Sequence, residues 1–208
     1  MIDTSWLKIS QSGLYVTPAF AHIDPLVAVD TAIITHGHAD HARAGHGHVI
    51  ATPETLAIMS ARYGANFAGQ QTALSYNQQL TLGDVSVKLI PAGHVLGSAQ
   101  IVLEYANAKI IAAGDYKRRS DPTCSSFQVE QCDVFITEAT FGLPVFAHPE
   151  PETQIKKLLE VQHLFPERSI LIGAYALGKA QRLIALLREA GYDKTIFIHG
   201  AMKKLCEL

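Results

Sequence analysis

The segment THGHADH, residues 35–41, constrains this chain more than any other feature of its sequence. Three histidines and one aspartate occur in six consecutive positions, directly after the apolar run AII at 32–34. The apolar run predicts a short buried strand that ends in a compact loop. Imidazole nitrogens and carboxylate oxygens suit zinc best, and they also suit manganese and iron. A solvated loop that is rich in histidine by chance is the weaker interpretation, so the segment predicts a metal site.

The spacing within this segment divides its side chains between two ions. His36 and His38 are two positions apart, so in extended chain both side chains point to the same side and can hold one ion. Asp40 and His41 come after the turn and suit a second ion.

Two ions need more ligands than one loop supplies, and two later strand ends offer them. His94 lies in PAGHVLGS, after the apolar run at 85–90, and Asp115 lies in AAGDYKRR, after the run at 110–113. Both residues follow a glycine at the end of a predicted strand, where loops can bring together ligands from distant parts of a chain. We expect His94 to reach the first ion and the carboxylate of Asp115 to bridge both ions.

Short apolar runs bounded by Gly, Pro, Asp and Asn dominate the first half of the chain and predict strands. One helix interrupts them, with Thr52 as its N-cap, Pro53 as its first residue and its end near Gly64. The segments at 100–105 and 110–113 flank Ala106-Asn107-Ala108 and predict a hairpin. The predicted strands are residues 14–17, 32–35, 48–51, 85–90, 100–105, 110–113 and 134–138.

The second half predicts longer elements. A helix at 152–164 is followed by a strand at 169–173, a helix at 177–190 that Gly191 ends, and a strand at 195–199. Strand, helix and strand in this order favour a parallel pair. The sequence HPEP at 148–151 cannot continue a strand, so it predicts a boundary near 147–151.

The order HGHADH, GH and GD resembles that of the metallo-β-lactamase fold, a four-layer αββα sandwich with a dinuclear site at one edge. FITEATFG at 135–142 is similar to the E-[ST]-T-[YF]-G motif of the β-CASP nucleases, a branch of that fold. IGAYALGKAQR at 172–182 and IFIHGAMKKL at 196–205 resemble the first strands and helices of the β-CASP cap domain. Along nearly its whole length the chain resembles bacterial exonucleases associated with ATP-dependent DNA ligase, which are relatives of mRNA 3′-end processing nucleases.

This resemblance implies a set of site residues. The expected reaction is phosphodiester hydrolysis by a hydroxide that two zinc ions activate. Glu138 is expected to orient a catalytic-site histidine, since a carboxylate behind an imidazole fixes its tautomer. The expected catalytic residues are Asp40, Asp115 and Glu138, and the expected metal ligands are His36, His38 and His94 for the first ion, Asp40 and His41 for the second, and Asp115 for both.

The resemblance also implies how the chain is organised. The expected fold class is α/β (α+β), with residues 1–165 as the N-terminal part of a metallo-β-lactamase-like domain and 166–208 as the opening βαβ of a β-CASP-like cap. Proteins of this family continue well past this point and carry two further histidine motifs. One of these supplies a ligand to the second ion and the other a proton donor. We therefore expect a chain that is truncated at its C-terminus.

The expected function is that of a cytoplasmic DNA exonuclease in DNA ligation and repair, which acts on DNA rather than RNA and has a DNA ligase as a possible partner. A catalytically incomplete remnant that binds metal or nucleic acid is the main alternative. An RNA-processing nuclease or a small-molecule metallo-hydrolase is more distant, and the cap-like segment at 170–208 argues against the small-molecule enzyme.

Basic residues near the predicted site are candidates for contacts with substrate phosphate. Lys117, Arg118 and Arg119 follow Asp115 closely, and Lys179 begins a predicted helix, whose N-terminus attracts phosphate. The segment GAYALGK at 173–179 also fits a P-loop, but Ala180 replaces the required hydroxyl residue and no Walker B partner follows.

Composition limits the partners that this chain can have. The 17 Lys and Arg residues against 19 Asp and Glu residues give a net charge of −2, so a surface that binds nucleic acid must be local. Since no run approaches about 18 apolar residues, we expect no membrane span.

Overall fold

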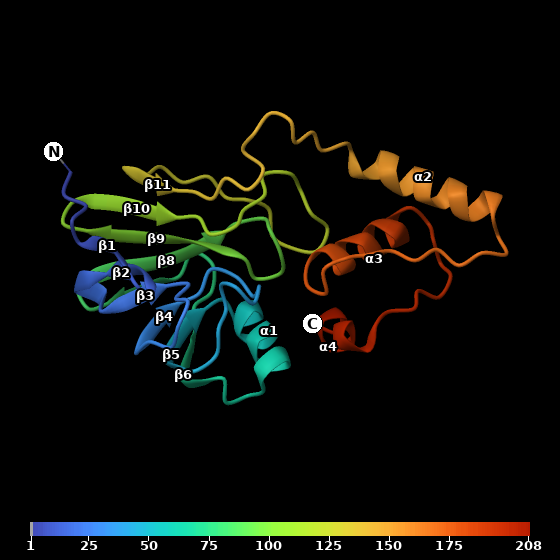
Figure 1. Cartoon of the computed structure of the whole chain (residues 1–208). Helices are drawn as coiled ribbons and strands as arrows, with labels where there is room; N and C mark the ends of the chain where they lie inside the picture. Colours follow the sequence, from blue (N-terminus) through green and yellow to red (C-terminus); the bar gives the residue numbers. More distant parts are fainter. Residues whose placement is uncertain (1) are drawn as a thin grey trace. The chain divides into compact units, whose positions relative to one another are not determined.

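The computed structural model describes residues 2–208, which Figure 1 shows as a ribbon. The chain divides into two compact units, one that extends to Glu138 and includes Leu208, and one that covers Ala139–Glu207. This division concerns compactness and not family membership. The predicted family domains, 1–165 and 166–208, stay a prediction.

Two β-sheets form the first unit (Figure 1). Within residues 2–138, one sheet has the strand order β1 (Leu7–Ser10), β2 (Gly13–Val16), β3 (Ala21–Ile23), β4 (Thr31–Ile33), β5 (His46–Ala51) and β6 (Ala68–Ala73). The other has the order β11 (Val134–Ile136), β10 (Ala108–Ala112), β9 (Ala99–Tyr105), β8 (Val85–Pro91) and β7 (Gln79–Leu82). A short 3-10 helix, η1 (Thr17–Ala19), links β2 to β3.

The main core lies between the two sheets. Alternate residues of β8, Val85, Val87 and Leu89, are fully buried, as the two-residue period of a strand requires when one face meets a core. Ile101 and Leu103 of the adjacent β9 belong to the same buried cluster. Burial of each such side chain contributes about 1.5–3 kcal/mol. This layer therefore holds in place the strands whose ends carry the predicted ligands.

Helix α1 (Pro53–Tyr63) packs on the other face of the six-stranded sheet, and its prediction is confirmed. Thr52 caps it, because the side chain of Thr52 accepts a hydrogen bond from the backbone N–H of Thr55. Leu56 and Met59 pack against buried side chains of β4 and β5. One helix and two sheets give three of the four layers of the predicted sandwich, and the predicted mixed α/β class is confirmed.

Irregular chain lies against the outer face of the five-stranded sheet. Cys132, in the segment between β10 and β11, packs against Ile90, Val102 and Ile111 of that sheet. Nearby, the Nζ atoms of Lys88 and Lys109 donate to the carboxylate of Glu130. The sheet is thus covered through side-chain contacts at a place where an αββα sandwich has a helix.

The strands predicted in the first unit are confirmed, with ends that agree within two residues. The predicted hairpin joins β9 to β10, and both of its turn residues, Ala106 and Asn107, have positive φ angles of 49° and 61°. β1, β3, β6 and β7 were not predicted. β6 has the polar sequence AGQQTA, so it is a strand because β5 pairs with it and not because of its own pattern. The sequence of β7, QLTL, does alternate, with Leu80 and Leu82 toward the core, but it is only four residues long.

The second unit contains α2 (Pro151–Leu164), α3 (Lys179–Glu189), the 3-10 helix η2 (Gly200–Met202) and the short α4 (Lys203–Cys206). Both long helices were predicted. The strands predicted at 169–173 and 195–199 are wrong, because within Ala139–Glu207 no neighbouring strand pairs with either segment. Leu171 and Phe197 in these segments are 95% and 93% exposed. Of the predicted βαβ, only the helix is formed.

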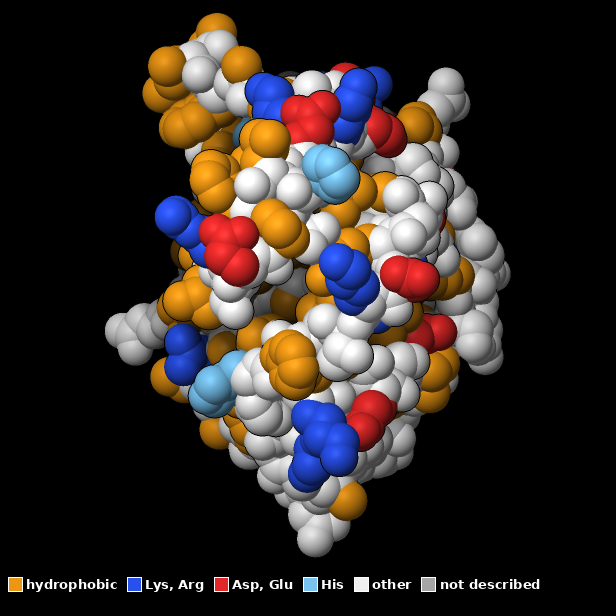
Figure 2. Space-filling view, turned by 90° about the vertical axis from the view of Figure 1, so that its right-hand side faces the viewer, with side chains coloured by type: hydrophobic (Ala, Val, Ile, Leu, Met, Phe, Trp, Pro, Cys, Tyr) orange, Lys and Arg blue, Asp and Glu red, His pale blue; other side chains and the backbone are white. Residues whose placement is uncertain are grey.

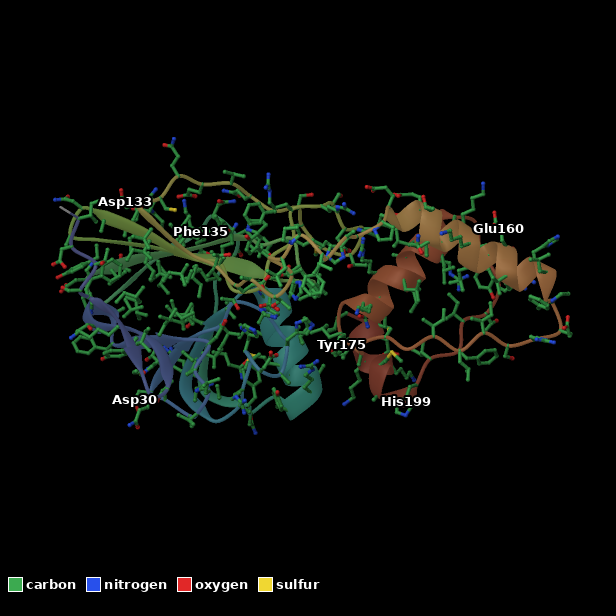
Figure 3. The ribbon with its side chains drawn as sticks, turned by 45° about the horizontal axis from the view of Figure 1, so that its top comes forward. Asp30, Asp133, Phe135, Glu160, Tyr175 and His199 are labelled. Carbon is green, nitrogen blue, oxygen red and sulfur yellow. The ribbon has the colours of Figure 1, made fainter. Side chains whose placement is uncertain are left out.

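Figure 3 locates the helices and strands through labelled side chains, among them Phe135 on β11 and Glu160 on α2. Across residues 2–208, no helix is both long enough and apolar enough to cross a membrane.

Candidate metal centre

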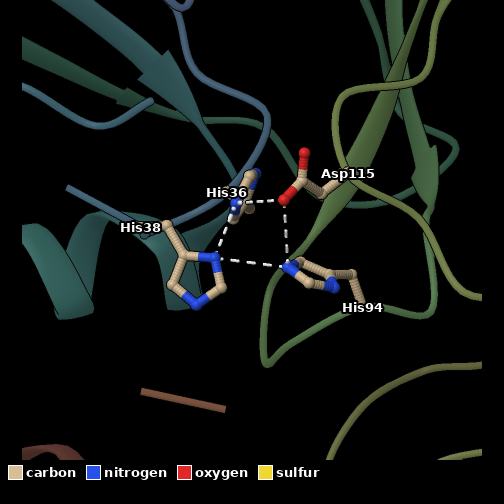
Figure 4. Close-up of side chains that lie close together, drawn as sticks. All are labelled: His36, His38, His94 and Asp115. Atoms are coloured by element: carbon tan, nitrogen blue, oxygen red, sulfur yellow. Dashed lines mark hydrogen bonds and ion pairs between the residues drawn. The ribbon is translucent and has the colours of Figure 1, made fainter. Parts of the chain in front are cut away.

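Three loops that follow strand ends bring the predicted ligands together. His36 and His38 follow β4, His94 follows β8 and Asp115 follows β10. β9 is antiparallel to both β8 and β10, so these two strands run in the same direction and end at the same edge of their sheet. One ligand atom from each of the four residues lies within 4.8 Å of all the others (Figure 4).

The separations of these ligand atoms fit a single divalent ion. The Nδ1 of His38 lies 2.9 Å from the Nε2 of His36 and 3.2 Å from the Nε2 of His94. The Oδ2 of Asp115 lies 3.8 Å and 3.5 Å from the same two Nε2 atoms. Zinc bonds of about 2.0–2.1 Å in a tetrahedron place neighbouring ligand atoms about 3.3 Å apart, in the middle of these values. Three imidazoles and one carboxylate are also a donor set that zinc accepts.

A second, smaller group lies on the other side of the Asp115 carboxylate. The Nε2 of His41 is 3.5 Å from the Oδ1 of Asp115 and 3.8 Å from the Oδ2 of Asp40. Asp115 therefore presents one oxygen to each group, as a bridging carboxylate does. The side chain of Asp40 is 78% exposed, so this group is more open to solvent than the first.

Burial keeps two of the histidines of the first group neutral. The pKa of His36 lies well below its usual value, because the side chain is buried and close to three other histidines. Burial, with the adjacent His38 and the positive charge of Lys117, lowers the pKa of His94 to about 4. A neutral imidazole is the form that binds a metal ion, so these histidines need not lose a proton at neutral pH.

The two groups differ in how burial and charge act on them. Burial lowers the pKa of His41, but the hydrogen bond to Asp24 and the charges of Asp24, Asp115 and Asp40 together raise it above its usual value. Burial raises the pKa of Asp115, and the charge of Glu138 acts in the same direction. The charges of His41 and His38 act in the opposite direction, so burial is the largest cause of the raised pKa of Asp115.

Asp24 supports both groups and was missed by the sequence analysis. Its carboxylate accepts hydrogen bonds from the backbone N–H of Thr35 at 2.8 Å, from the Thr35 hydroxyl at 2.5 Å, and from the Nδ1 of His41 at 2.8 Å. The Thr35 oxygen in turn lies 3.0 Å from the Nδ1 of His36. One carboxylate thus favours a proton on Nδ1 of both histidines, which leaves each Nε2 free toward its ligand group.

The sequence contains one signal that would have indicated Asp24. It directly follows β3, which ends at Ile23, much as Asp115 comes three residues after the end of β10. Its φ angle of 42° lies in the left-handed region, which aspartate adopts more readily than most residues.

Glu138 follows β11 at the same sheet edge, since β11 pairs in parallel with β10. It is half-buried, and its charge acts on both His94 and Asp115. The structure therefore places this side chain close to the two ligand groups.

The predicted phosphate contacts lie in different environments. The ammonium of Lys117 forms an ion pair with Asp121, whose side chain is 2% exposed, whereas Arg118 and Arg119 are exposed. Lys179 begins α3 in the second unit, with its Nζ 5.0 Å from the centre of the Tyr175 ring. Since the segment at 169–173, which leads into GAYALGK, does not form a strand, the context of a P-loop is missing.

Charge on the face drawn in Figure 2 is mixed. Lysine and arginine side chains alternate there with aspartate, glutamate and exposed hydrophobic side chains. Among the described residues of this face, no continuous basic band is visible.

Known proteins similar to this chain include nucleases. A family model described as a beta-lactamase superfamily domain matches residues 1–199. Endoribonuclease ysh-1 of Neurospora crassa is 31% identical over 238 residues, a match that covers 94% of this chain and 28% of that protein. A probable DNA ligase of Opitutus terrae is 28% identical, with coverage of 93% and 19%. Cleavage and polyadenylation specificity factor subunit 3-I of Arabidopsis thaliana is 27% identical, with coverage of 86% and 30%.

The chain spans less than a third of the length of these relatives. Among solved structures, a protein of unknown function from Enterococcus faecalis V583 has a similar fold, with a TM-score of 0.50 and 16% identity over 82% of this chain and 53% of that chain. At this identity the likeness concerns the fold alone.

Proposed function

Because the chain belongs to the beta-lactamase superfamily, we propose that it is a metal-dependent hydrolase of phosphodiester bonds in nucleic acid. The observation that carries the proposal is the convergence of His36, His38, His94 and Asp115, with ligand atoms within 4.8 Å of one another. Relatives named endoribonuclease and DNA ligase support a nucleic-acid substrate and agree with the β-CASP branch.

We assign the ligands as the sequence predicted. His36, His38 and His94 would hold the first ion, Asp40 and His41 would hold the second, and the carboxylate of Asp115 would serve both. Zinc is the proposed metal, since imidazoles dominate the donor set. When bound, two ions provide an activated water at neutral pH and neutralise charge on the attacked phosphate.

The protein side chains orient the ligands and hold protons in this scheme. Asp24 keeps the Nδ1 protons of His36 and His41 in place, directly or through Thr35, so that both Nε2 atoms carry a free electron pair. Glu138, half-buried beside His94 and Asp115, is the proposed partner for a catalytic-site histidine. Arg118 and Arg119 are exposed three and four residues after Asp115 and suit the phosphate backbone.

We propose DNA as the substrate and an exonuclease activity in DNA ligation and repair, with a DNA ligase as a possible partner. The relative named probable DNA ligase supports this choice. We extend the proposed phosphate contacts to Lys117 and Lys179, as the sequence predicted. RNA is the second candidate substrate, because other relatives are named endoribonucleases.

A second candidate function is binding without cleavage. The second ligand group has three members, one of them largely exposed, so its ion is expected to bind more weakly than the first. A protein that holds only the first ion would bind metal and nucleic acid without hydrolysis. This candidate corresponds to the incomplete remnant that the sequence left open.

The test combines metal analysis with a cleavage assay. The purified chain is loaded with zinc, and its ion content is measured together with cleavage of end-labelled DNA and RNA. We expect two ions per chain, and a loss of cleavage of at least about a hundredfold in Asp115→Asn, because the bridging carboxylate supports both ions. Asp193→Asn, which changes an exposed carboxylate in the second unit, is the matched control. One ion and no cleavage by the wild type would refute hydrolysis and favour the binding function instead.

A further inference from the structure

Helix α1 contacts both loops that carry the histidines of the first ligand group. Its N-terminal end lies against loop 92–98, which carries His94. Further along, it lies against loop 34–42, which carries His36 and His38. Among the described residues, the ligand group draws no member from α1. The helix is therefore placed to fix the separation of the two loops without touching an ion.

At the N-terminal end, two threonine hydroxyls converge on one carbonyl oxygen. The Oγ1 of Thr52 donates to the oxygen of Gly97 at 2.7 Å, and the Oγ1 of Thr55 donates to it at 3.1 Å. Both threonines are at most 1% exposed, so water cannot easily take the place of a hydroxyl donor that a substitution removes. The positive end of the helix dipole also favours a carbonyl oxygen at this position.

Gly97 allows this close approach, and its neighbour connects it to the ligand. Gly97 has a φ angle of +74°, and a Cβ there would lie 2.8 Å from the Oγ1 of Thr52 and the backbone nitrogen of Thr55. The Oγ of Ser98 accepts the backbone N–H of His94 at 3.0 Å. The hydrogen bonds from α1 therefore restrain the backbone of a ligand through one intervening hydroxyl.

Further along α1, the contact is with the peptide between the two other ligands. The Nη1 of Arg62 donates to the oxygen of Gly37 at 2.8 Å. Ile58, one turn earlier, is fully buried, and a Cβ on Gly37 would lie 2.6 Å from its Cγ2. Thr55, Ile58 and Arg62 are three and four positions apart, so they share one face of the helix.

We propose that Thr55 and Arg62 are positioning residues, which hold the two ligand loops at the separation that the first ion requires. This inference rests on the proposed function, since it requires the ligand group to bind an ion. Loops that are already ordered lose less conformational freedom when an ion binds, and affinity rises accordingly. The helix would supply this order before the metal arrives.

The sign of the effect at Arg62 separates positioning from electrostatics. The positive charge of Arg62 acts on His36 and opposes a cation there. If charge alone mattered, Arg62→Met would bind zinc more tightly than the wild type. If positioning dominates, the same variant binds zinc more weakly.

The experiment measures zinc affinity of the whole chain by competition with a chromophoric chelator, and unfolding of the metal-free protein by urea. We expect Thr55→Val and Arg62→Met each to weaken binding of the first ion about 10–100-fold. Thr55→Ser and Arg62→Lys keep a donor and should stay within about threefold of the wild type. If Thr55→Val or Arg62→Met fails to fold, the zinc affinities of Thr55→Ser and Arg62→Lys still test the proposal.

Matched controls remove comparable groups elsewhere. Thr17→Val deletes a buried hydroxyl that has no hydrogen-bond partner, and Arg168→Met deletes an exposed guanidinium of the second unit. Neither should change zinc affinity. Unchanged or tighter zinc binding in both Thr55→Val and Arg62→Met overturns the positioning role while the proposed function stands. A wild-type protein that binds no zinc overturns the proposed function, and this inference with it.

Discussion

Replacing Asp24 by asparagine should weaken zinc binding while the protein stays folded. The substitution preserves the size of the side chain and suits a residue with a φ angle of 42°, since asparagine also adopts the left-handed region. The Oδ2 that faces the Thr35 hydroxyl and the Nδ1 of His41 becomes an amide NH₂ if Oδ1 keeps its hydrogen bond from the Thr35 backbone. A donor then faces two groups that formerly donated.

The magnitude follows from these hydrogen bonds. To accept from the new amide, His41 must move its proton from Nδ1 to Nε2, and the Thr35 hydroxyl must turn its own proton toward the Nδ1 of His36. Both histidines are then driven to a tautomer in which the atom facing the ligand group is protonated. Changes of this kind behind metal-binding histidines weaken affinity about 10–100-fold. The folded protein loses about 1–2 kcal/mol, because charged hydrogen bonds become neutral ones.

Two measurements test the Asp24→Asn prediction. Chelator competition gives the zinc affinities, and ¹⁵N NMR of the imidazoles distinguishes Nδ1–H from Nε2–H tautomers. Asp30→Asn is the control, because Asp30 is exposed at the surface of the same unit (Figure 3). The reasoning is refuted if Asp24→Asn binds zinc within about twofold of the wild type while His41 still carries its proton on Nδ1.

Two further predictions concern stability. Burial disfavours the charge of Glu130, but hydrogen bonds from Lys88 and Lys109 outweigh it and lower the pKa below the usual value of 4.5. Its stabilisation is therefore present above about pH 4.5 and is lost as pH falls through the folded-state pKa, so Glu130→Gln should cost about 1 kcal/mol at pH 7 and little near pH 3 in urea titrations. A cost that does not depend on pH would contradict this. Gly114→Ala should cost about 2–4 kcal/mol, because φ is +56° and the new Cβ would lie 2.7 Å from the Cβ of Thr35. Gly191→Ala, with φ of +82° after the end of α3 and open space around the new Cβ, should lose only about 1–2 kcal/mol, and equal losses in the two variants would show that crowding at Thr35 is unimportant.

Local sequence determined which residues could form the centre. THGHADH, PAGH and AAGD each place a ligand type directly after an apolar run, and a strand end is a local property. The alternation of β8 and the hairpin at Ala106 and Asn107 were predictable for the same reason, since neighbours along the chain set both. The β-rich first half and the helix after Thr52 followed from such local patterns.

Tertiary structure decided which side chains form hydrogen bonds with the proposed ligands and their loops. It also decided which segments become strands. Asp24 reaches His41 across 17 positions and Thr55 reaches Gly97 across 42, and no local pattern marks residues that meet at such separations. β6 is polar but forms a strand because β5 offers it a partner, whereas the apolar segments at 169–173 and 195–199 have no such partner within the described chain and form none. A strand requires hydrogen bonds from a neighbour, and a tautomer requires a partner for one ring nitrogen. Sequence determined the types of the proposed ligands, and their three-dimensional neighbours determined the separation of these side chains and the positions of their protons.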